Sequence, residues 1–231
     1  LRDEISEQGR VTAIMNLAEK SSCRQYYWKN RGVLPLGYFK GLALSYSKSL
    51  CALKRGDTGA ALMAAPVPAT SRDALAHYSI ANGTPEENLK NLYTLVMGLG
   101  ARESSGKYCV GRDVTNPEPS STGAEAGLFQ TSYNAIEAVK IYSKSAAQEM
   151  TNLFAAYQAD SSQCELSVFA EGVDYAKKCA GHNESNYGTP PGATYQKLAK
   201  ACPMFHTEFS LIGIRHRRDH WRSEEHTSEL Q

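Results

Sequence analysis

The chain has 231 residues, of which 42% are apolar and 21% are charged, and its formal net charge is only +1. A chain of this length and composition can bury a core, so intrinsic disorder is excluded. The balance of charges excludes binding to nucleic acid through the overall charge of the protein. No apolar stretch reaches the roughly 20 residues that a membrane-spanning helix needs, so no integral membrane segment is expected.

Helical periodicity dominates the first third of the chain. Apolar residues share one face of a predicted helix over residues 37–55, and Gly56 and Asp57 supply its end. Residues 59–70 are rich in Ala and Pro and predict a connector, and residues 71–80 predict a short helix. We expect residues 1–82 to form a helical extension packed on the domain that follows.

The clearest helix start in the chain lies at Thr84. Thr84 is an N-cap residue, Pro85 takes the first helical position, and Glu87 completes a capping box. The apolar stripe of this helix is Leu89, Leu92, Val96 and Leu99, and the next position on the same stripe is Glu103. The pattern therefore directs a carboxyl group towards the core near the end of the helix.

The remaining chain continues the helical pattern after one loop. Residues 108–126 are typical of a loop and offer the one place for a small β-hairpin. Further helices are predicted near Ser132 and over residues 146–157, 165–173, 193–201 and 206–220, the last with Phe209, Ile212 and His216 on one side. The sequence thus predicts a mainly α fold with at most a small β-hairpin.

Six cysteines are spread along the chain, at Cys23, Cys51, Cys109, Cys164, Cys179 and Cys202. No two of them form a CxxC motif, so disulfides explain them better than a clustered zinc site does, and buried free thiols are the alternative. The sequence does not choose among the possible pairings.

The position of Glu103 suits a general acid. Burial and a helix C-terminus both disfavour the ionised form of a carboxyl group, so a proton can persist near neutral pH, as cleavage of a glycosidic bond requires. The alternative is an ordinary solvated glutamate where the helix frays at Gly100 and Gly106.

Two short blocks carry a resemblance. Glu103, Ser104 and Gly106 form the first, and Gly127, Leu128, Phe129 and Gln130 form the second. Together they resemble the active-site signature of soluble lytic transglycosylases and goose-type lysozymes, Glu-Ser with a nearby Gly and then Gly-Leu-Met-Gln, with Phe129 in place of Met. The resemblance covers residues 92–138 and implies a lysozyme-like fold, which is α+β by convention, with a transglycosylase domain over residues 83–221.

The same resemblance implies an activity and its residues. It implies cleavage of the β-1,4 bond between N-acetylmuramic acid and N-acetylglucosamine in peptidoglycan, outside the cytoplasm (periplasmic or secreted) and without a cofactor. Glu103 would be the catalytic acid. The implied substrate-binding residues are Ser104, Gly127, Leu128, Phe129 and Gln130. Tyr133 and Tyr187 are further candidates: Tyr133 follows Gln130 too closely to match the tyrosine that transglycosylases carry well downstream, and Tyr187 is a candidate for that role.

The number of carboxyl groups separates two outcomes, because hydrolysing glycosidases ordinarily use a pair. Asp113 and Glu125 are the candidates for a second acid. Goose-type lysozymes carry an Asp two residues after the motif Gln, and here that position is Ser132, which favours a lytic transglycosylase. A hydrolysing muramidase is the alternative, and a non-catalytic glycan-binding domain is another.

Two other features are interpreted without a function. The six histidines lack the spacing of metal ligands, so no metal site is predicted. Arg215, His216 and His220 lie in a short basic run that predicts a solvated face. Residues 222–231 resemble a translated sequencing adapter, and we expect a non-native tail there.

Overall fold

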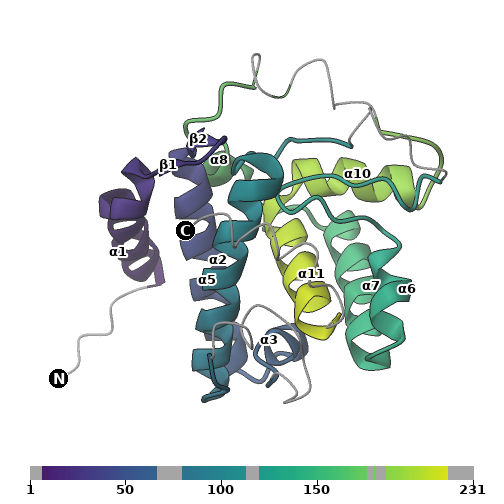
Figure 1. The fold of residues 1–231 in the computed structure, drawn as a ribbon. Coiled ribbons are helices and arrows are strands. Elements are labelled where there is room, and N and C mark those ends of the chain that lie inside the picture. The colour runs from purple at the N-terminus through teal and green to yellow at the C-terminus, as the bar shows by residue number, and fades with distance from the viewer. Residues whose placement is uncertain (1–6, 67–79, 113–119, 176–178, 180–185, 218–231) are drawn as a thin grey trace.

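The computed structural model describes residues 7–66, 80–112, 120–175, 179 and 186–217, and they form a mainly helical fold (Figure 1). The helices with bounds in these residues are, in chain order, α1 (Glu7–Lys20), α2 (Leu36–Lys54), α3 (Thr58–Met63), α5 (Pro85–Ser104), α6 (Ala135–Lys140), α7 (Lys144–Ala159), α8 (Leu166–Phe169), α10 (Gly192–Ala201) and α11 (Pro203–His216). A four-residue 3₁₀ helix, η1 (Ser22–Gln25), follows α1. The predicted helix over residues 71–80 falls largely outside the described residues.

Helix α5 follows the rules that predicted it. The Thr84 hydroxyl accepts a hydrogen bond from the Glu87 N–H at 3.3 Å, and the Glu87 carboxylate accepts one from the Thr84 N–H at 2.8 Å. The predicted stripe is buried, as Leu89, Leu92, Val96 and Leu99 all belong to the core. The capping box and the apolar face are therefore confirmed.

Helices α2 and α11 contribute much of the core beside α5. The predicted helix over residues 37–55 is confirmed as α2, which packs against α1, α5, α8 and α11. Its Tyr38 is fully buried and donates a hydrogen bond from its hydroxyl to the Met97 carbonyl of α5 at 2.7 Å. Helices α2 and α3, which precede residue 82, contact α5 and α11, which follow it. The division of the chain into an extension and a catalytic domain at residue 82 remains a prediction.

The small hairpin lies elsewhere than predicted. Strands β1 (Tyr27–Trp28) and β2 (Gly32–Val33) pair antiparallel, and Asn30 and Gly32 in their turn have φ of +62° and +76°. The described part of residues 108–126 contains turns and an isolated bridge from Ala126 to Thr131 instead. The missed signal was Asn30 and Gly32, residue types that tolerate positive φ.

The predicted connector over residues 59–70 is wrong at its start, where α3 forms. Asp57 is the N-cap of α3, and its side chain accepts a hydrogen bond from the Ala60 N–H at 2.9 Å. In the sequence Asp57 suits the end of α2, but a single aspartate after a helix can also begin the next one.

The later helices were predicted with variable bounds. Helices α6, α7 and α10 lie close to their predicted ranges, and α8 is only four residues long. Helix α11 is buried nearly all round, and its Leu211 and Ile212 belong to the core. Its Phe205 and Phe209 form an aromatic cluster with Tyr195 from α10.

The predicted solvated face at the end of α11 is wrong at Arg215, whereas Arg217 is exposed. Arg215 is 1% exposed, and its guanidinium donates to the Met63 carbonyl at 3.0 Å and to the Asn88 carbonyl at 2.9 Å. His216 pairs with the Leu62 carbonyl at 3.0 Å. Met63 ends α3, and its carbonyl lacks an acceptor role within that helix, so a buried cation there is stabilised. His220 lies outside the described residues.

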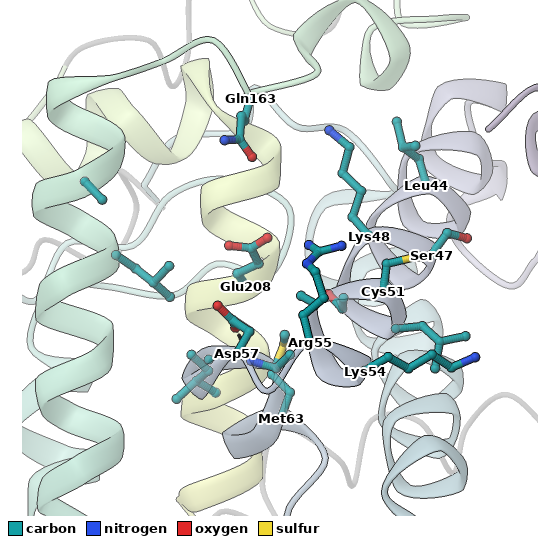
Figure 2. A pocket seen from close by; sticks show the side chains of 18 of the residues that line it. Leu44, Ser47, Lys48, Cys51, Lys54, Arg55, Asp57, Met63, Gln163 and Glu208 are labelled. Atoms are coloured by element: carbon teal, nitrogen blue, oxygen red, sulfur yellow. Dashed lines mark hydrogen bonds between the residues drawn. The ribbon is translucent and has the colours of Figure 1, made fainter. Parts of the chain in front are cut away.

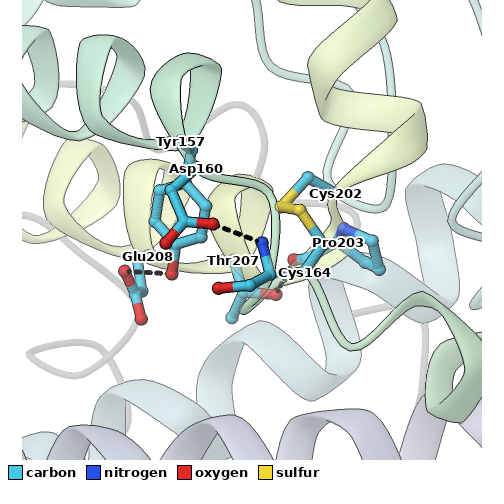
Figure 3. The surroundings of a disulfide bond; sticks show 8 residues. Tyr157, Asp160, Cys164, Cys202, Pro203, Thr207 and Glu208 are labelled. Atoms are coloured by element: carbon cyan, nitrogen blue, oxygen red, sulfur yellow. Dashed lines mark hydrogen bonds between the residues drawn. A yellow bond between two sulfur atoms is a disulfide. The ribbon is translucent and has the colours of Figure 1, made fainter.

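Two disulfides join distant segments, as the interpretation of the cysteines predicted. Cys109 pairs with Cys179, and Cys164 pairs with Cys202 beside the start of α11 (Figure 3). Cys23 and Cys51 are free and exposed. No described helix combines the length and the apolar character that crossing a membrane requires.

Candidate active site

Glu103 lies in the last turn of α5 and is half-buried. The next residue, Ser104, is 2% exposed, and its hydroxyl donates to the Gly100 carbonyl at 3.0 Å. Ser105 then enters the left-handed region with φ of +53°, and Gly106 follows with φ of +69°. Their N–H groups bond to the Ala101 and Gly100 carbonyls at 3.1 and 3.0 Å, so the helix ends abruptly just beyond Glu103.

Gly106 is required at this helix end for a second reason. A Cβ at Gly106 would lie 2.9 Å from the ring of Tyr38. Because Tyr38 is anchored by its hydroxyl to α5, the ring has little room to move away. The first block of the resemblance is therefore a tight turn that fixes where Glu103 stands.

The second block forms another tight turn. Gly127 has φ of +78° and donates from its N–H to the Val110 carbonyl at 2.7 Å. Gln130 has φ of +47°, and its side-chain amide donates to the Gly127 carbonyl at 3.0 Å. The Gln130 side chain thus closes its own turn, and a non-glycine residue in this backbone region marks local strain.

The structure brings the two blocks together. The ring of Phe129 approaches Gly100 so closely that a Cβ at Gly100 would lie 3.0 Å from it. Glu103 is one helical turn beyond Gly100 on the same face. The side chain of Leu128 is fully buried and that of Phe129 is 3% exposed, so both pack inward. The predicted contribution of this turn to a sugar site therefore rests on its backbone and on Gln130, which is half-buried.

A buried polar network packs against the turn from Gly127 to Gln130. Thr131 shares its hydroxyl with the Tyr195 hydroxyl at 2.7 Å, with His206 Nε2 at 2.8 Å and with the Ser210 hydroxyl at 3.0 Å. His206 stacks on Phe129, and its Nδ1 has no hydrogen-bond partner. Burial lowers the pKa of His206 to about 3, so it is neutral at physiological pH.

The sequence analysis missed His206 as part of this region. A Cβ at Gly127 would lie 2.6 Å from His206 Nδ1, so a glycine is needed above the ring. The glycine is visible in the sequence, but its partner lies far along the chain in α11. The signal in the sequence was Gly127 itself, because a glycine in a loop often marks a positive φ or a close approach of another residue.

The other predicted site residues are less clustered. Tyr133 packs edge-on against Phe154 and Tyr195, on the core side of the second block. Tyr187 lies under the Arg112 guanidinium, at 4.6 Å from the ring centroid. Glu125 is exposed, and its charge contributes to raising the pKa of Tyr195, after burial. Asp113 lies outside the described residues.

A cavity of about 800 Å³ lies away from these blocks, between α1, α2, α3, α7 and α11. Figure 2 shows Glu208 directed from α11 into it. Burial raises the pKa of Glu208 to about 7, aided by Asp57 and Glu149, while Tyr157 and Lys48 act in the opposite direction. The Tyr157 hydroxyl donates to the Glu208 carboxylate at 3.1 Å (Figure 3).

Glu208 was not among the predicted residues. The pattern of α11 gives no warning, because it was interpreted as having one buried side, whereas the helix is covered almost all round. The described residues contain no group of three or more His, Cys, Asp or Glu that could hold a metal ion. Comparisons with family models, with curated proteins and with solved structures found no match to this chain.

Proposed function

We propose that the protein is a lytic transglycosylase with a lysozyme-like fold that cleaves the MurNAc-GlcNAc bond of peptidoglycan, with Glu103 as its catalytic acid. One observation carries the proposal. The two blocks of the resemblance are joined in space by the contact of Phe129 with Gly100, one turn from Glu103. Each block ends in a left-handed turn, at Ser105 and at Gln130, and such strained backbone clusters at functional sites.

Glu103 would act twice. As an acid it donates its proton to the bridging oxygen while the bond from that oxygen to muramoyl C1 breaks through an oxocarbenium-like state. The resulting carboxylate then takes the proton of the muramoyl 6-hydroxyl as that oxygen bonds to C1. The products are a new 4-hydroxyl on N-acetylglucosamine and a 1,6-anhydro ring, and Glu103 regains its proton.

The turn from Gly127 to Gln130 would hold the sugar beside this acid. Its backbone is fixed by the Gly127 bond to Val110 and by the Gln130 amide. A rigid turn suits catalysis, because a reactant held in place loses little entropy on reaching the transition state. Tyr187 under Arg112 offers a further ring for sugar contact.

The choice of a transglycosylase over a muramidase rests on the second acid. Ser132 occupies the position of the goose-type aspartate, and its hydroxyl is engaged by the Asn134 side chain at 2.6 Å. Of the two candidates for a second acid, Glu125 lies within the described residues, and it is exposed to solvent. Two disulfides fit an oxidising exterior such as the periplasm or the secreted medium, where peptidoglycan lies.

The test is the chemistry of the product ends. Purified walls digested with the protein are expected to release fragments with 1,6-anhydro ends, identified by mass spectrometry. Glu103→Gln should release these fragments about 10²–10⁴-fold more slowly, while Glu125→Gln, a matched change at an exposed glutamate, should retain the wild-type rate and product.

Release of fragments with reducing ends by the wild type, together with loss of that release in Glu125→Gln, would favour the muramidase. Binding to walls without any cleavage would favour the glycan-binding domain.

A further inference from the structure

A second pocket, of about 460 Å³, lies beside the end of α5. It is enclosed by η1, the β1–β2 hairpin, the start of α2, the residues after α5 and the residues after α8. We call it the hairpin pocket and define it by its polar lining: Arg24, Arg31, Ser105, Lys107 and Asp174. Ser105, which lines the pocket, is the C-cap of α5, two residues after Glu103 in the chain.

The charges of the hairpin pocket favour an anion. Arg24, Arg31 and Lys107 line it, against the single carboxylate of Asp174. The start of α2 lies at the same pocket, since Pro35 and Leu36 line it, and the first turn of this 19-residue helix holds no acidic residue. A helix N-terminus carries a partial positive charge. The Gly37 N–H of that turn already donates to the Glu171 carbonyl at 2.7 Å, so the arginines and the lysine supply most of the positive charge.

Arg31 is a hydrogen-bond donor without an acceptor. Its Nε is buried and has no hydrogen-bond partner, although its backbone is fixed in the hairpin turn by a bond from its N–H to the Trp28 carbonyl at 2.9 Å. Buried polar atoms are nearly always paired, so an unpaired one in a pocket wall calls for a ligand. A guanidinium matches a carboxylate through two parallel hydrogen bonds.

We propose that the hairpin pocket binds a carboxylate of the peptide that muramic acid carries in peptidoglycan. This inference rests on the proposed function and names the part of the substrate that the site beside Glu103 would recognise. The peptide of a glycan strand bound at Glu103 would have to reach past the end of α5, where Ser105 and Lys107 line the pocket. The aliphatic lining from Val33, Leu34 and Val173 suits the carbon chain that bears such a carboxylate.

The experiment measures binding to the full chain with Glu103→Gln, so that the ligand is not consumed. Three probes are compared by calorimetry: a disaccharide-tetrapeptide, the same molecule with its peptide carboxylates amidated, and the disaccharide without peptide. The free carboxylates should tighten binding about tenfold or more over the amidated probe, as for a hydrogen bond between charged groups. The amidated probe needs no further change in the protein, so this arm does not depend on the folding of a pocket variant.

A matched pair of variants locates the effect. Arg31→Gln should abolish the preference for free carboxylates, while Lys29→Gln, which removes a charge from an exposed position of the same turn, should keep it. Equal binding of the free and amidated probes would overturn the inference.

The proposed function is read separately, from wall digestion by the wild-type chain. Cleavage of walls without a preference for free carboxylates would overturn only the proposal for the hairpin pocket. A preference for free carboxylates without cleavage would overturn only the proposed transglycosylase activity.

Discussion

Glu103 and Glu208 are two half-buried glutamates whose surroundings differ. Glu208 stands in the middle of α11 and faces a cavity walled by regular helices. Glu103 stands at the end of α5, where the backbone bends sharply at Ser105, Gly106, Gly127 and Gln130. The surroundings of Glu103 thus combine a carboxyl group with left-handed turns from two distant segments. None of the described residues that line the cavity at Glu208 has a positive φ.

A raised pKa does not by itself identify a catalytic acid. Burial alone can raise the pKa of a carboxyl group, as at Glu208, where Tyr157 also holds the side chain by a hydrogen bond. Catalysis needs in addition a fixed surface that positions a substrate. The turns around Glu103 provide backbone of that kind, which is why our proposal places the catalytic acid at Glu103.

Gly127→Ala, next to the Glu103 region, should have the largest effect on stability. The new Cβ would lie 2.6 Å from His206 Nδ1 at a φ of +78°. Left-handed backbone and overpacking together should lower the free energy of unfolding by about 2–5 kcal/mol. Chemical denaturation measures this value.

Gly32→Ala is the matched control. Its φ is +76°, but a Cβ there has nothing within 4 Å. Only the backbone cost remains, about 1–2 kcal/mol. Equal losses in the two variants would show that the contact with His206 does not matter.

Glu208→Gln should have a smaller effect that depends on pH. The pKa of Glu208 rises from 4.5 to about 7 on folding, so its contribution to stability is fully present below 4.5 and is lost as the pH rises through 7. Gln stays neutral. The variant should therefore gain about 1–3 kcal/mol over the wild type between about pH 5 and about pH 8.

His206 should make the Glu103 region respond in the opposite direction. Its pKa falls from 6.5 to about 3 on folding, so the unfolded chain takes up a proton first, and stability is lost as the pH falls from 6.5 towards 3. Denaturation curves at several pH values should show this loss of stability towards low pH in both the wild type and Glu208→Gln. The loss of stability as the pH rises from 4.5 through 7 should appear only in the wild type. A difference between the chains that does not change with pH would contradict the assignment to Glu208.

The sequence predicted best what local rules determine. The start of α5 follows from Thr84, Pro85 and Glu87, and its buried face from the spacing of four apolar residues. The two blocks could also be singled out, because each is short and contiguous. Their contact through Phe129 and Gly100 could only be expected from the resemblance, since it depends on how α5 packs.

Features that depend on distant neighbours were missed. Arg215 looked solvated because its sequence neighbours are charged, yet carbonyls of Met63 and Asn88 satisfy it in the core. Glu208 and His206 lie on a helix that is buried nearly all round, where periodicity distinguishes no outer face. The hairpin pocket assembles residues from five segments, and no single segment carries its charge pattern.

The most direct test of the account compares Glu103→Gln with Glu208→Gln on the same purified walls. Both changes remove one carboxylate and keep the shape of the side chain, and circular dichroism checks that both chains are folded. The rate of release of 1,6-anhydro fragments should fall about 10²–10⁴-fold for Glu103→Gln, the usual contribution of a general acid, and should remain at the wild-type level for Glu208→Gln. Loss of the activity in Glu208→Gln with retention in Glu103→Gln would contradict the assignment of the catalytic acid.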